Sequence, residues 1–205
     1  MALAVLGRGF LNKSGNEQEA VALYEALVAA VRRNWPDNRN AILQMKANLA
    51  AAYEEADRLE ESIALKREGY LDAKAMAGPR SELALALANN LAVALMTKGS
   101  YAEARTLLKA QTEYQGPDAP LDNELTLSLL TNYAKTLHKN PGAVPDDLLE
   151  AIATYEKCLT AARRVYGPGH PYPKRWEEGL EIARAALAAP KSARFERALK
   201  RARKD

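Results

Sequence analysis

Apolar residues recur at steps of three and four along most of the chain, which is the period of an α-helix with one buried face. The clearest run lies between residues 17 and 33, where Ala20, Leu23, Tyr24, Leu27 and Val31 fall on one helical face. Prolines, glycines and short polar clusters interrupt the pattern at intervals and indicate where each helix ends. The expected helices span about residues 2–13, 17–33, 39–56, 59–76, 81–98, 101–114, 122–138, 146–165, 174–188 and 192–203.

These helices come in pairs, and the pairs form an internal repeat of 42 residues. Two columns, meaning sets of positions that the repeat makes equivalent, keep this spacing: Asn48, Asn90, Asn132 and Ala20, Ser62, Ala104. A fourth member of the second column, Ala151, comes 47 residues after Ala104. Five extra residues therefore enter between Asn132 and Ala151, and we assign them to a lengthened turn at residues 140–145. A repeat of this length is typical of stacked supersecondary units.

The columns predict how the helices pack. Small residues are expected where two helices cross closely, and leucines with a few tyrosines are expected to fill the core between them. The small columns are Ala50, Ala92, Ala134 and Ala20, Ser62, Ala104, Ala151; the core columns are Leu49, Leu91, Leu180 and Tyr53, Leu95, Leu137. Gly15 and Gly99 lie at turns where a positive φ favours glycine, and Asp57 is the tolerated substitute at the equivalent turn.

A helical hairpin cannot bury its apolar side alone, so neighbouring hairpins must stack. The sequence therefore predicts an all-α fold, a right-handed α-solenoid of stacked antiparallel helical hairpins. The expected solenoid occupies residues 1–190, with repeats at about 1–38, 39–80, 81–120 and 121–171 and a partial repeat at 172–190. A basic C-terminal capping helix or tail would follow at residues 191–205.

The order of a small–Leu–Ala core, a turn glycine and then an aromatic–x–Glu–Ala segment resembles the tetratricopeptide repeat, whose usual unit is about 34 residues. The 42-residue spacing and the linker that begins at Gly167 are more similar to the kinesin-light-chain type. The resemblance covers residues 1 to about 188, with departures at Gly69 and Gln111. HEAT and armadillo repeats share the period but fit the turn glycine and the Glu-Ala pair less well. The resemblance implies a non-catalytic scaffold or adaptor for protein–protein interactions, as a subunit or assembly factor of a larger complex.

Composition excludes several other classes of protein. Hydrophobic residues are 48% of the chain and charged residues 27%, a balance that favours a folded globular protein over a disordered one. No apolar run reaches the roughly 18 residues that a transmembrane helix needs, and the first ten residues lack the basic leader of a secretory signal. The single cysteine, Cys158, rules out an intrachain disulfide and fits a reducing compartment. We therefore expect an intracellular protein, in the cytoplasm or in an organelle lumen.

No group of residues suggests catalysis. His138 and His170 are the only histidines, and neither has a cysteine or second histidine at metal-ligand spacing. Cys158 falls on the apolar face of its helix with Tyr155 and Leu159, so we interpret it as a core thiol rather than a nucleophile. The sequence predicts no catalytic residue, no metal site and no cofactor. An enzyme with an unrecognised site is the rival class.

The repeated asparagines are the best candidates for a binding function. In stacked hairpins of this type the first helix of each pair lines the concave face, and an amide can both donate to and accept from a peptide backbone. The alternative is that these amides tie one helix to the next, because buried polar groups are normally satisfied within a protein. The candidate partner-binding groove comprises Gln44, Asn48, Glu55, Asn89, Asn90, Thr97, Ser128, Thr131, Asn132, Lys135 and Lys139.

The two ends of the chain carry further candidate surfaces. In the first helix, apolar residues would have no preceding repeat to cover them, which invites a partner or self-association; they are Leu3, Val5, Leu6 and Phe10. Residues 191–205 have a net charge of +5, whereas residues 1–190 have −2. The basic residues of this tail are Lys191, Arg194, Arg197, Lys200, Arg201, Arg203 and Lys204. A capping helix is our preferred interpretation, and docking on RNA or another acidic surface is the alternative function. Nucleic-acid binding is less favoured because no aromatic stacking platform accompanies the charges.

Overall fold

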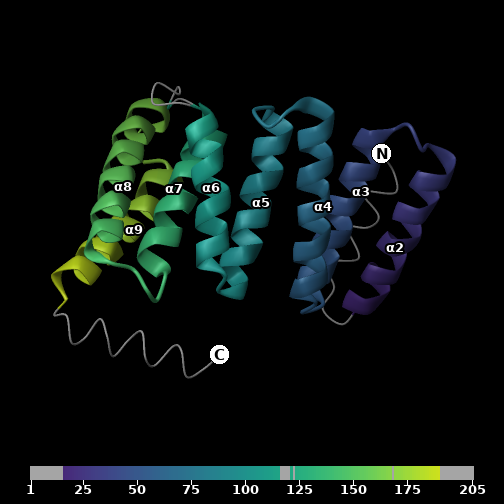
Figure 1. Ribbon diagram of the computed structural model, residues 1–205, viewed down its shortest axis with the longest axis horizontal. Coiled ribbons are helices and arrows are strands. Elements are labelled where there is room, and N and C mark those ends of the chain that lie inside the picture. Colours follow the sequence, from purple (N-terminus) through teal and green to yellow (C-terminus); the bar gives the residue numbers. More distant parts are fainter. Residues whose placement is uncertain (1–15, 116–120, 122, 168, 190–205) are drawn as a thin grey trace. The chain divides into compact units, whose positions relative to one another are not determined.

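The computed structural model describes residues 16–115, 121, 123–167 and 169–189, and the regular secondary structure within them is α-helical throughout. The helices are α2 (Glu17–Asn34), α3 (Arg39–Glu55), α4 (Leu59–Ala77), α5 (Glu82–Lys98), α6 (Tyr101–Gln115), α7 (Glu124–Lys139), α8 (Pro145–Tyr166) and α9 (Pro171–Ala188) (Figure 1). The helices expected at residues 2–13 and 192–203 lie outside the described residues, as do the apolar first-helix residues and the basic tail.

Within the described residues the structure confirms the helices that the sequence predicts, with boundaries that differ by at most three residues. Residues 140–144 separate α7 from α8, where the lengthened turn was expected. The largest difference is at α9, which begins at Pro171 instead of near residue 174. Pro171 and Pro173 stand in the first turn, where a helical residue has no intrahelical N–H bond to lose and proline is tolerated. We expected these prolines to lie before the helix, and they lie within it.

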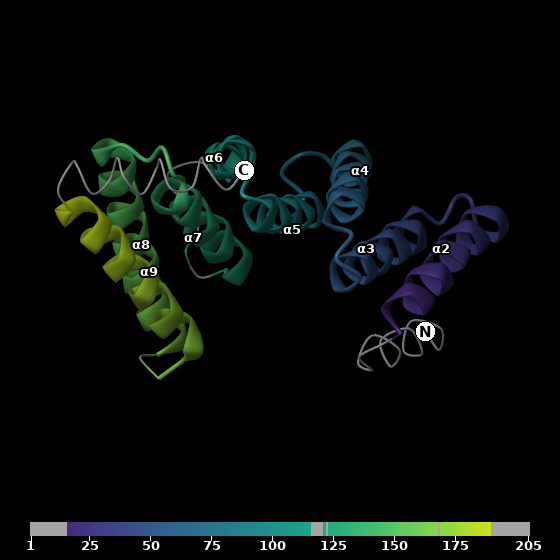
Figure 2. The same cartoon turned by 90° about the horizontal axis from the view of Figure 1, so that it is seen from below.

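The chain divides into two compact units, residues 1–94 (unit 1) and residues 95–205 (unit 2), with the division inside α5. Within unit 1, α3 packs against both α2 and α4, and consecutive helices run antiparallel (Figure 1). Within unit 2, α6 packs against α7, and Figure 2 shows α7, α8 and α9 side by side. The hairpin architecture of the prediction is therefore present in both units.

The core of unit 1 follows the predicted columns. Val21, Tyr24 and Val28 of α2 pack against Leu49 and Ala52 of α3. The small-residue positions of unit 1 are closed completely to solvent, and they are Ala20, Ala50, Ser62 and Ala92, each 0% exposed. Because protein interiors are as dense as organic crystals, a larger side chain there would have to push two helices apart.

In unit 2, an ion pair and side-chain hydrogen bonds between helices supplement the same kind of apolar core. Arg105 of α6 pairs with Asp147 of α8 at 2.8 Å, and the Tyr133 hydroxyl of α7 donates to Glu150 of α8 at 2.7 Å. Asp147 also accepts a hydrogen bond from the backbone N–H of Val144 at 3.1 Å, which caps the start of α8. These contacts join α6, α7 and α8 across the turn that carries the five additional residues.

The turns between paired helices confirm the backbone expectation. Gly99, between α5 and α6, has φ 90°, and Asp57, at the equivalent turn between α3 and α4, has φ 58°. A positive φ costs an ordinary residue free energy but costs Gly little and Asp only moderately. The repeat therefore specifies its turn through a backbone conformation, and two different residue types supply it.

Gly179 gives the sharpest test of how α8 and α9 pack. A Cβ atom at this position would lie 2.7 Å from Cζ of Tyr155, a ring that is completely buried. Alanine normally stabilises the interior of a helix relative to glycine by roughly 0.5–1 kcal/mol. We expect Gly179→Ala instead to lower the free energy of unfolding by about 1–3 kcal/mol, because overpacking outweighs the helix propensity. Urea unfolding followed by circular dichroism measures this.

Gly69→Ala is the matched control, because Gly69 is also buried inside a helix but its nearest neighbour, Cδ2 of Leu43, would lie at 3.8 Å from the new Cβ. That variant should be as stable as the wild type or slightly more stable. Equal stabilisation by both substitutions would show that α8 and α9 do not pack as closely as described.

Candidate functional site

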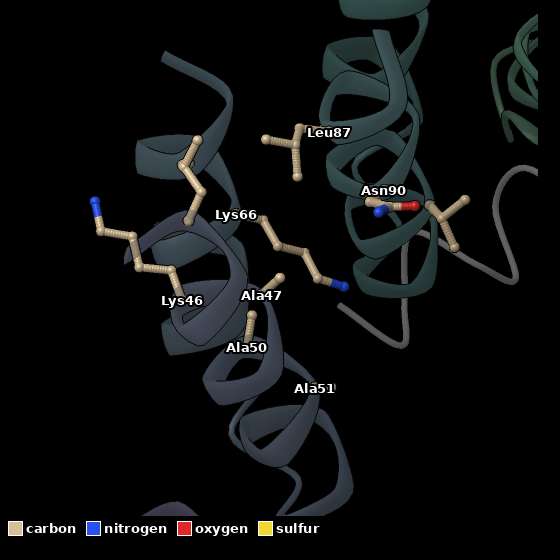
Figure 3. Close-up of a pocket in the computed structure, with 10 residues that line it drawn as sticks. Lys46, Ala47, Ala50, Ala51, Lys66, Leu87 and Asn90 are labelled. Carbon is tan, nitrogen blue, oxygen red and sulfur yellow. The ribbon is translucent and has the colours of Figure 1, made fainter. Parts of the chain in front are cut away.

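Unit 1 contains a pocket of about 230 Å³ between α3, α4 and α5, called the α3–α5 pocket below. Four of its ten lining residues are alanine or glycine, among them Ala47 and Ala51 of α3 and Gly69 of α4, and their small side chains leave space between the helices. Ala51 and Val93 are equivalent positions of successive repeats, so two neighbouring hairpins contribute matching walls. The lining residues are Leu43, Lys46, Ala47, Ala50, Ala51, Lys66, Gly69, Leu87, Asn90 and Val93 (Figure 3).

The two lysines of this pocket have their charges neutralised within unit 1. Lys46 is 3% exposed, and its Nζ lies 2.7 Å from Glu68 Oε1 and 2.5 Å from Asp72 Oδ2. Lys66 pairs with Glu54. Figure 3 shows Lys66 between the alanines of α3 and the side chains of α5, whereas Lys46 points away from the opening. The lysines therefore contribute their hydrocarbon stems to the pocket, which is apolar in character.

Asn90 is the residue of the predicted groove that lines this pocket. Its side chain is exposed at the pocket beside Leu87 (Figure 3), and it makes no hydrogen bond to another of the described residues. Asn48, one repeat earlier, is partly buried and accepts a hydrogen bond from Gln44 Nε2 at 3.3 Å within α3. Of the two unit 1 asparagines in this column, Asn90 is therefore the one presented at an apolar surface with its amide available.

The remaining candidate residues are in different environments. Asn89 is partly buried, and Glu55 and Thr97 are exposed; none of the three lines the α3–α5 pocket. In unit 2, Thr131 is 2% exposed and its hydroxyl donates to the backbone oxygen of Leu127 at 2.9 Å. Asn132 is 7% exposed and accepts from Lys135 Nζ at 3.0 Å. Asn48, Asn90 and Asn132 thus occupy equivalent helices, α3, α5 and α7, but differ in what surrounds them.

Lys135 of α7 is at the centre of a second group of polar residues. Its side chain is partly buried, Lys139 follows one turn later on the same helix, and Arg175 of α9 adds to the positive charge around it. Burial, together with the charges of Arg175 and Lys139, lowers the pKa of the Lys135 amine from 10.5 to about 8. Ser128, which is partly buried, precedes Lys135 by two turns on α7. We call Lys135, Lys139 and Arg175 the basic cluster.

Sequence reasoning missed Arg175, although the repeat contains the signal that would have found it. Gln44 and Ser128 were assigned to the groove, and they belong to one column of the repeat. Extending that column by the lengthened repeat of 47 residues leads from Ser128 to Arg175. Lys66 and Leu87 of the α3–α5 pocket were missed for another reason, because neither occupies a column that the asparagines mark.

Two buried polar groups of unit 2 meet at the interface of α7 and α8. Nδ1 of His138 lies 3.0 Å from the backbone oxygen of Ala134, and the imidazole ring is 5.7 Å from the Tyr155 ring between centroids. Nε2 of His138 and the hydroxyl of Tyr155 are buried and have no hydrogen-bond partner among the described residues. Burial lowers the pKa of His138 below its usual 6.5, and the nearby Lys139 and Lys135 act in the same direction, against the hydrogen bond with Ala134.

Cys158 is fully buried, and burial raises the pKa of its thiol to about 12. The thiol is therefore protonated at neutral pH, which confirms the interpretation as a core residue. Among the described residues, no three His, Cys, Asp or Glu side chains are grouped as a metal site requires. None of the described helices has the length and apolarity to cross a membrane.

Comparison with known proteins agrees with this geometry. Residues 84–110 and 146–172 match a family model described as the tetratricopeptide repeat. These two segments are similar to tetratricopeptide repeats. The first matched segment covers most of α5 and of α6. The second covers nearly all of α8 and the first residues of α9. No curated protein matches the sequence.

Solved structures show the same fold at low sequence identity. The nearly identical TPR-like repeats of a Podosopora anserina protein assigned as a kinesin light chain, in a form with one substitution, align over 98% of this chain and 92% of theirs, with TM-score 0.76 and 22% identity. Another crystal structure of these repeats gives TM-score 0.74, 21% identity and coverage of 97% and 92%. BtubC (BKLC) from P. vanneervenii gives 0.73 and 15% identity, over 97% of this chain and 74% of that one. These structures confirm the predicted fold, an α-solenoid of helical hairpins like that of kinesin-light-chain-like repeat proteins.

The buried His138 makes stability depend on pH. Because its pKa is lower in the folded chain than the 6.5 of an exposed histidine, the unfolded chain takes up the proton first as the pH falls. The contribution of His138 to the free energy of unfolding is greatest where the residue is neutral in both states, above its unfolded-state pKa of 6.5. It decreases as the pH falls below that value. We expect the free energy of unfolding to fall between pH 7.5 and 5.5, by at most about 1.4 kcal/mol per pH unit from this residue.

Urea unfolding at several pH values measures the slope for the wild type and for His138→Gln, which should have a shallower one. His170→Gln, which removes the other histidine and its stacking on Tyr166, is the control. Identical slopes for the wild type and His138→Gln would contradict the buried, neutral state of His138.

Proposed function

We propose that the chain is a non-catalytic scaffold or adaptor, a subunit or assembly factor of a larger complex, that binds an extended segment of a partner protein at the α3–α5 pocket. The observation that carries the proposal is the position of Asn90. An exposed amide with no hydrogen-bond partner among the described residues stands at an apolar pocket lined by two successive repeats.

The size of the pocket favours a protein side chain as the ligand. At about 230 Å³ it is smaller than the roughly 300–1,000 Å³ of pockets that hold drug-sized molecules. Burying one aliphatic side chain stabilises a complex by about 1.5–3 kcal/mol. The Asn90 amide can pair with a peptide group in either orientation, which adds on the order of 1 kcal/mol. An apolar anchor and an adjacent backbone contact together describe the recognition of an extended segment.

The chemistry of the polar residues supports a binding role rather than catalysis. The amines of Lys46 and Lys66, the two lysines that line the pocket, are paired with carboxylates. Paired amines are poorly suited to act as a nucleophile or general base there, whereas apolar walls and an amide serve binding directly. Tetratricopeptide repeats in two segments of the chain are consistent with a protein partner.

Substitution of Asn90 tests the hydrogen-bonding half of the proposal. The wild-type chain, immobilised, is used to capture proteins from an extract of its source, and the partner is identified by mass spectrometry and then titrated in purified form. Asn90→Ala should weaken its binding roughly three- to tenfold without changing the melting temperature. Asn40→Ala is the matched control, because Asn40 is exposed on α3 and lies outside the pocket. Normal binding by Asn90→Ala would refute the role of this amide.

Filling the pocket tests its apolar half. Ala47 is exposed and lines the pocket, so Ala47→Leu should occupy part of the cavity at little cost in stability and reduce partner binding at least about fivefold, since about 1 kcal/mol of anchor burial is lost. Ala64 is exposed on α4 and does not line the pocket, and Ala64→Leu should bind as the wild type does. Equal binding by both variants would show that the partner does not enter the pocket.

A further inference from the structure

Unit 1 has another pocket at the end of the α3–α4 pair, where the first turn of α3 lies beside the last turns of α4. Its volume is about 330 Å³. Its lining residues are Pro36, Arg39, Ile42, Leu43, Asp72, Ala75 and Met76. We call it the Arg39 pocket. It shares only Leu43 with the α3–α5 pocket, so it is a distinct cavity.

The wall of the Arg39 pocket is mainly apolar, since five of its seven lining residues carry no polar side chain. Leu43 is buried and forms a hydrophobic cluster with Ala73 and Ala84, and Met76 packs against this cluster. The pocket therefore opens directly onto the apolar core between α3, α4 and α5. An aliphatic group that entered it would exchange water for an apolar surface, which is favourable in proportion to the area covered.

The carboxylate of Asp72, which lines this pocket, is compensated inside unit 1. Asp72 Oδ2 lies 2.5 Å from Lys46 Nζ, and the same amine lies 2.7 Å from Glu68 Oε1. Glu68 in turn pairs with Arg32 of α2 at 3.1 Å. These four side chains carry two positive and two negative charges, so Asp72 adds no net negative charge to the pocket.

Arg39 is the charged residue of this pocket that lacks such compensation. Its side chain is exposed and forms no ion pair or hydrogen bond with any of the described residues. The first turn of α3 contains no acidic residue. Asp37, in the turn before α3, is exposed and forms no ion pair with a described residue either. The guanidinium of Arg39 therefore keeps its N–H donors for an anion, and a carboxylate matches them in a bidentate arrangement.

We propose that the Arg39 pocket binds a small amphipathic carboxylate, namely a free fatty acid with a chain of about eight carbons. Its head group pairs with Arg39, and its hydrocarbon chain lies against Leu43 and Met76. The volume of about 330 Å³ is at the lower end of the roughly 300–1,000 Å³ typical of small-molecule sites. A neutral apolar ligand would leave the charge of Arg39 unused, and a purely polar anion would leave the apolar wall in water. An amphipathic carboxylate uses both features.

The methionines of the chain give a local readout of this binding. The full chain, labelled with ¹³C at the methionine methyl groups, is titrated with octanoate at pH 7 and followed by ¹H–¹³C correlation spectra. The Met76 signal, assigned by its loss in Met76→Leu, should shift along a saturable curve. Met45 and Met96 do not line the pocket, and their signals should stay in place. For a ligand of this size we expect a dissociation constant of about 0.1–10 mM.

Substitution of Arg39 tests the recognition of the carboxylate. Arg39→Gln should raise the dissociation constant of octanoate about tenfold, the effect of losing one charge-assisted hydrogen bond, without lowering the melting temperature. The uncharged 1-octanol should bind the wild type more weakly than octanoate does, and it should bind Arg39→Gln as it binds the wild type. Arg33→Gln is the matched control, because Arg33 is exposed on α2 and does not line the pocket. This control should change the dissociation constant of octanoate less than twofold.

The opposite results overturn the proposal. If the Met76 signal does not respond to octanoate over this concentration range, the pocket does not take a fatty acid. If Arg39→Gln binds octanoate as the wild type does, Arg39 does not recognise the carboxylate. If vesicles of phosphatidylglycerol shift the Met76 signal and octanoate does not, the surface recognises a membrane instead. Asn90 and Ala47 do not line the Arg39 pocket, so the outcome of partner capture with their variants leaves this test unaffected.

Discussion

The close crossing of helices at small side chains is the constraint on which the rest of this structure depends. Ala20, Ser62, Ala104 and Ala151 follow one another at repeat spacing, and each is completely buried. Ser62 indicates that size decides the residue at this position, because its buried hydroxyl has no hydrogen-bond partner within the part of the chain that the structure describes. An orphaned hydroxyl costs about 1–3 kcal/mol, and a larger apolar side chain would cost as much or more by separating the helices. The repeat accepts the polar group and keeps the spacing.

The same small residues create the surface that we propose for binding. Ala47, Ala51 and Gly69 leave a cavity because they lack the atoms to fill it, and the neighbouring repeat closes the other side with Leu87 and Val93. Lys46 is buried at a position whose equivalent one repeat later is the fully buried Ala88, so a long charged side chain stands where the next repeat has a small apolar one. Its long side chain extends past the helix to reach Glu68 and Asp72. The pocket thus keeps apolar walls even though a lysine is among its lining residues.

The fold could be predicted from the sequence because the same pattern of small, apolar and turn residues recurs in successive repeats. The buried alanine columns, the leucines between them and the positive φ at Gly99 and Asp57 all follow from spacing and local chemistry. The start of α9 could not be read in this way, since a proline that ends one helix and a proline that begins the next look alike in sequence. The helices that pack against α7 could not be predicted from the sequence either. They bury Asn132, whereas Asn90 in the same column of the repeat is exposed.

The distribution of charge also explains why the candidate site could be predicted only in part. Periodicity identifies the helix face on which Lys135 lies, but the consequences of that position depend on which residues of other helices approach it. Lys46 pairs with a carboxylate of α4 and Lys66 with one of α3, so both charges are neutralised inside unit 1. For Lys135, burial lowers the pKa of the amine to about 8, and the positive charges of Arg175 and Lys139 act in the same direction. Two chemically different surfaces result, an apolar pocket with an amide in unit 1 and a basic face in unit 2. A segment that entered the proposed α3–α5 pocket would gain most by placing an aliphatic side chain there, because the pocket walls are apolar.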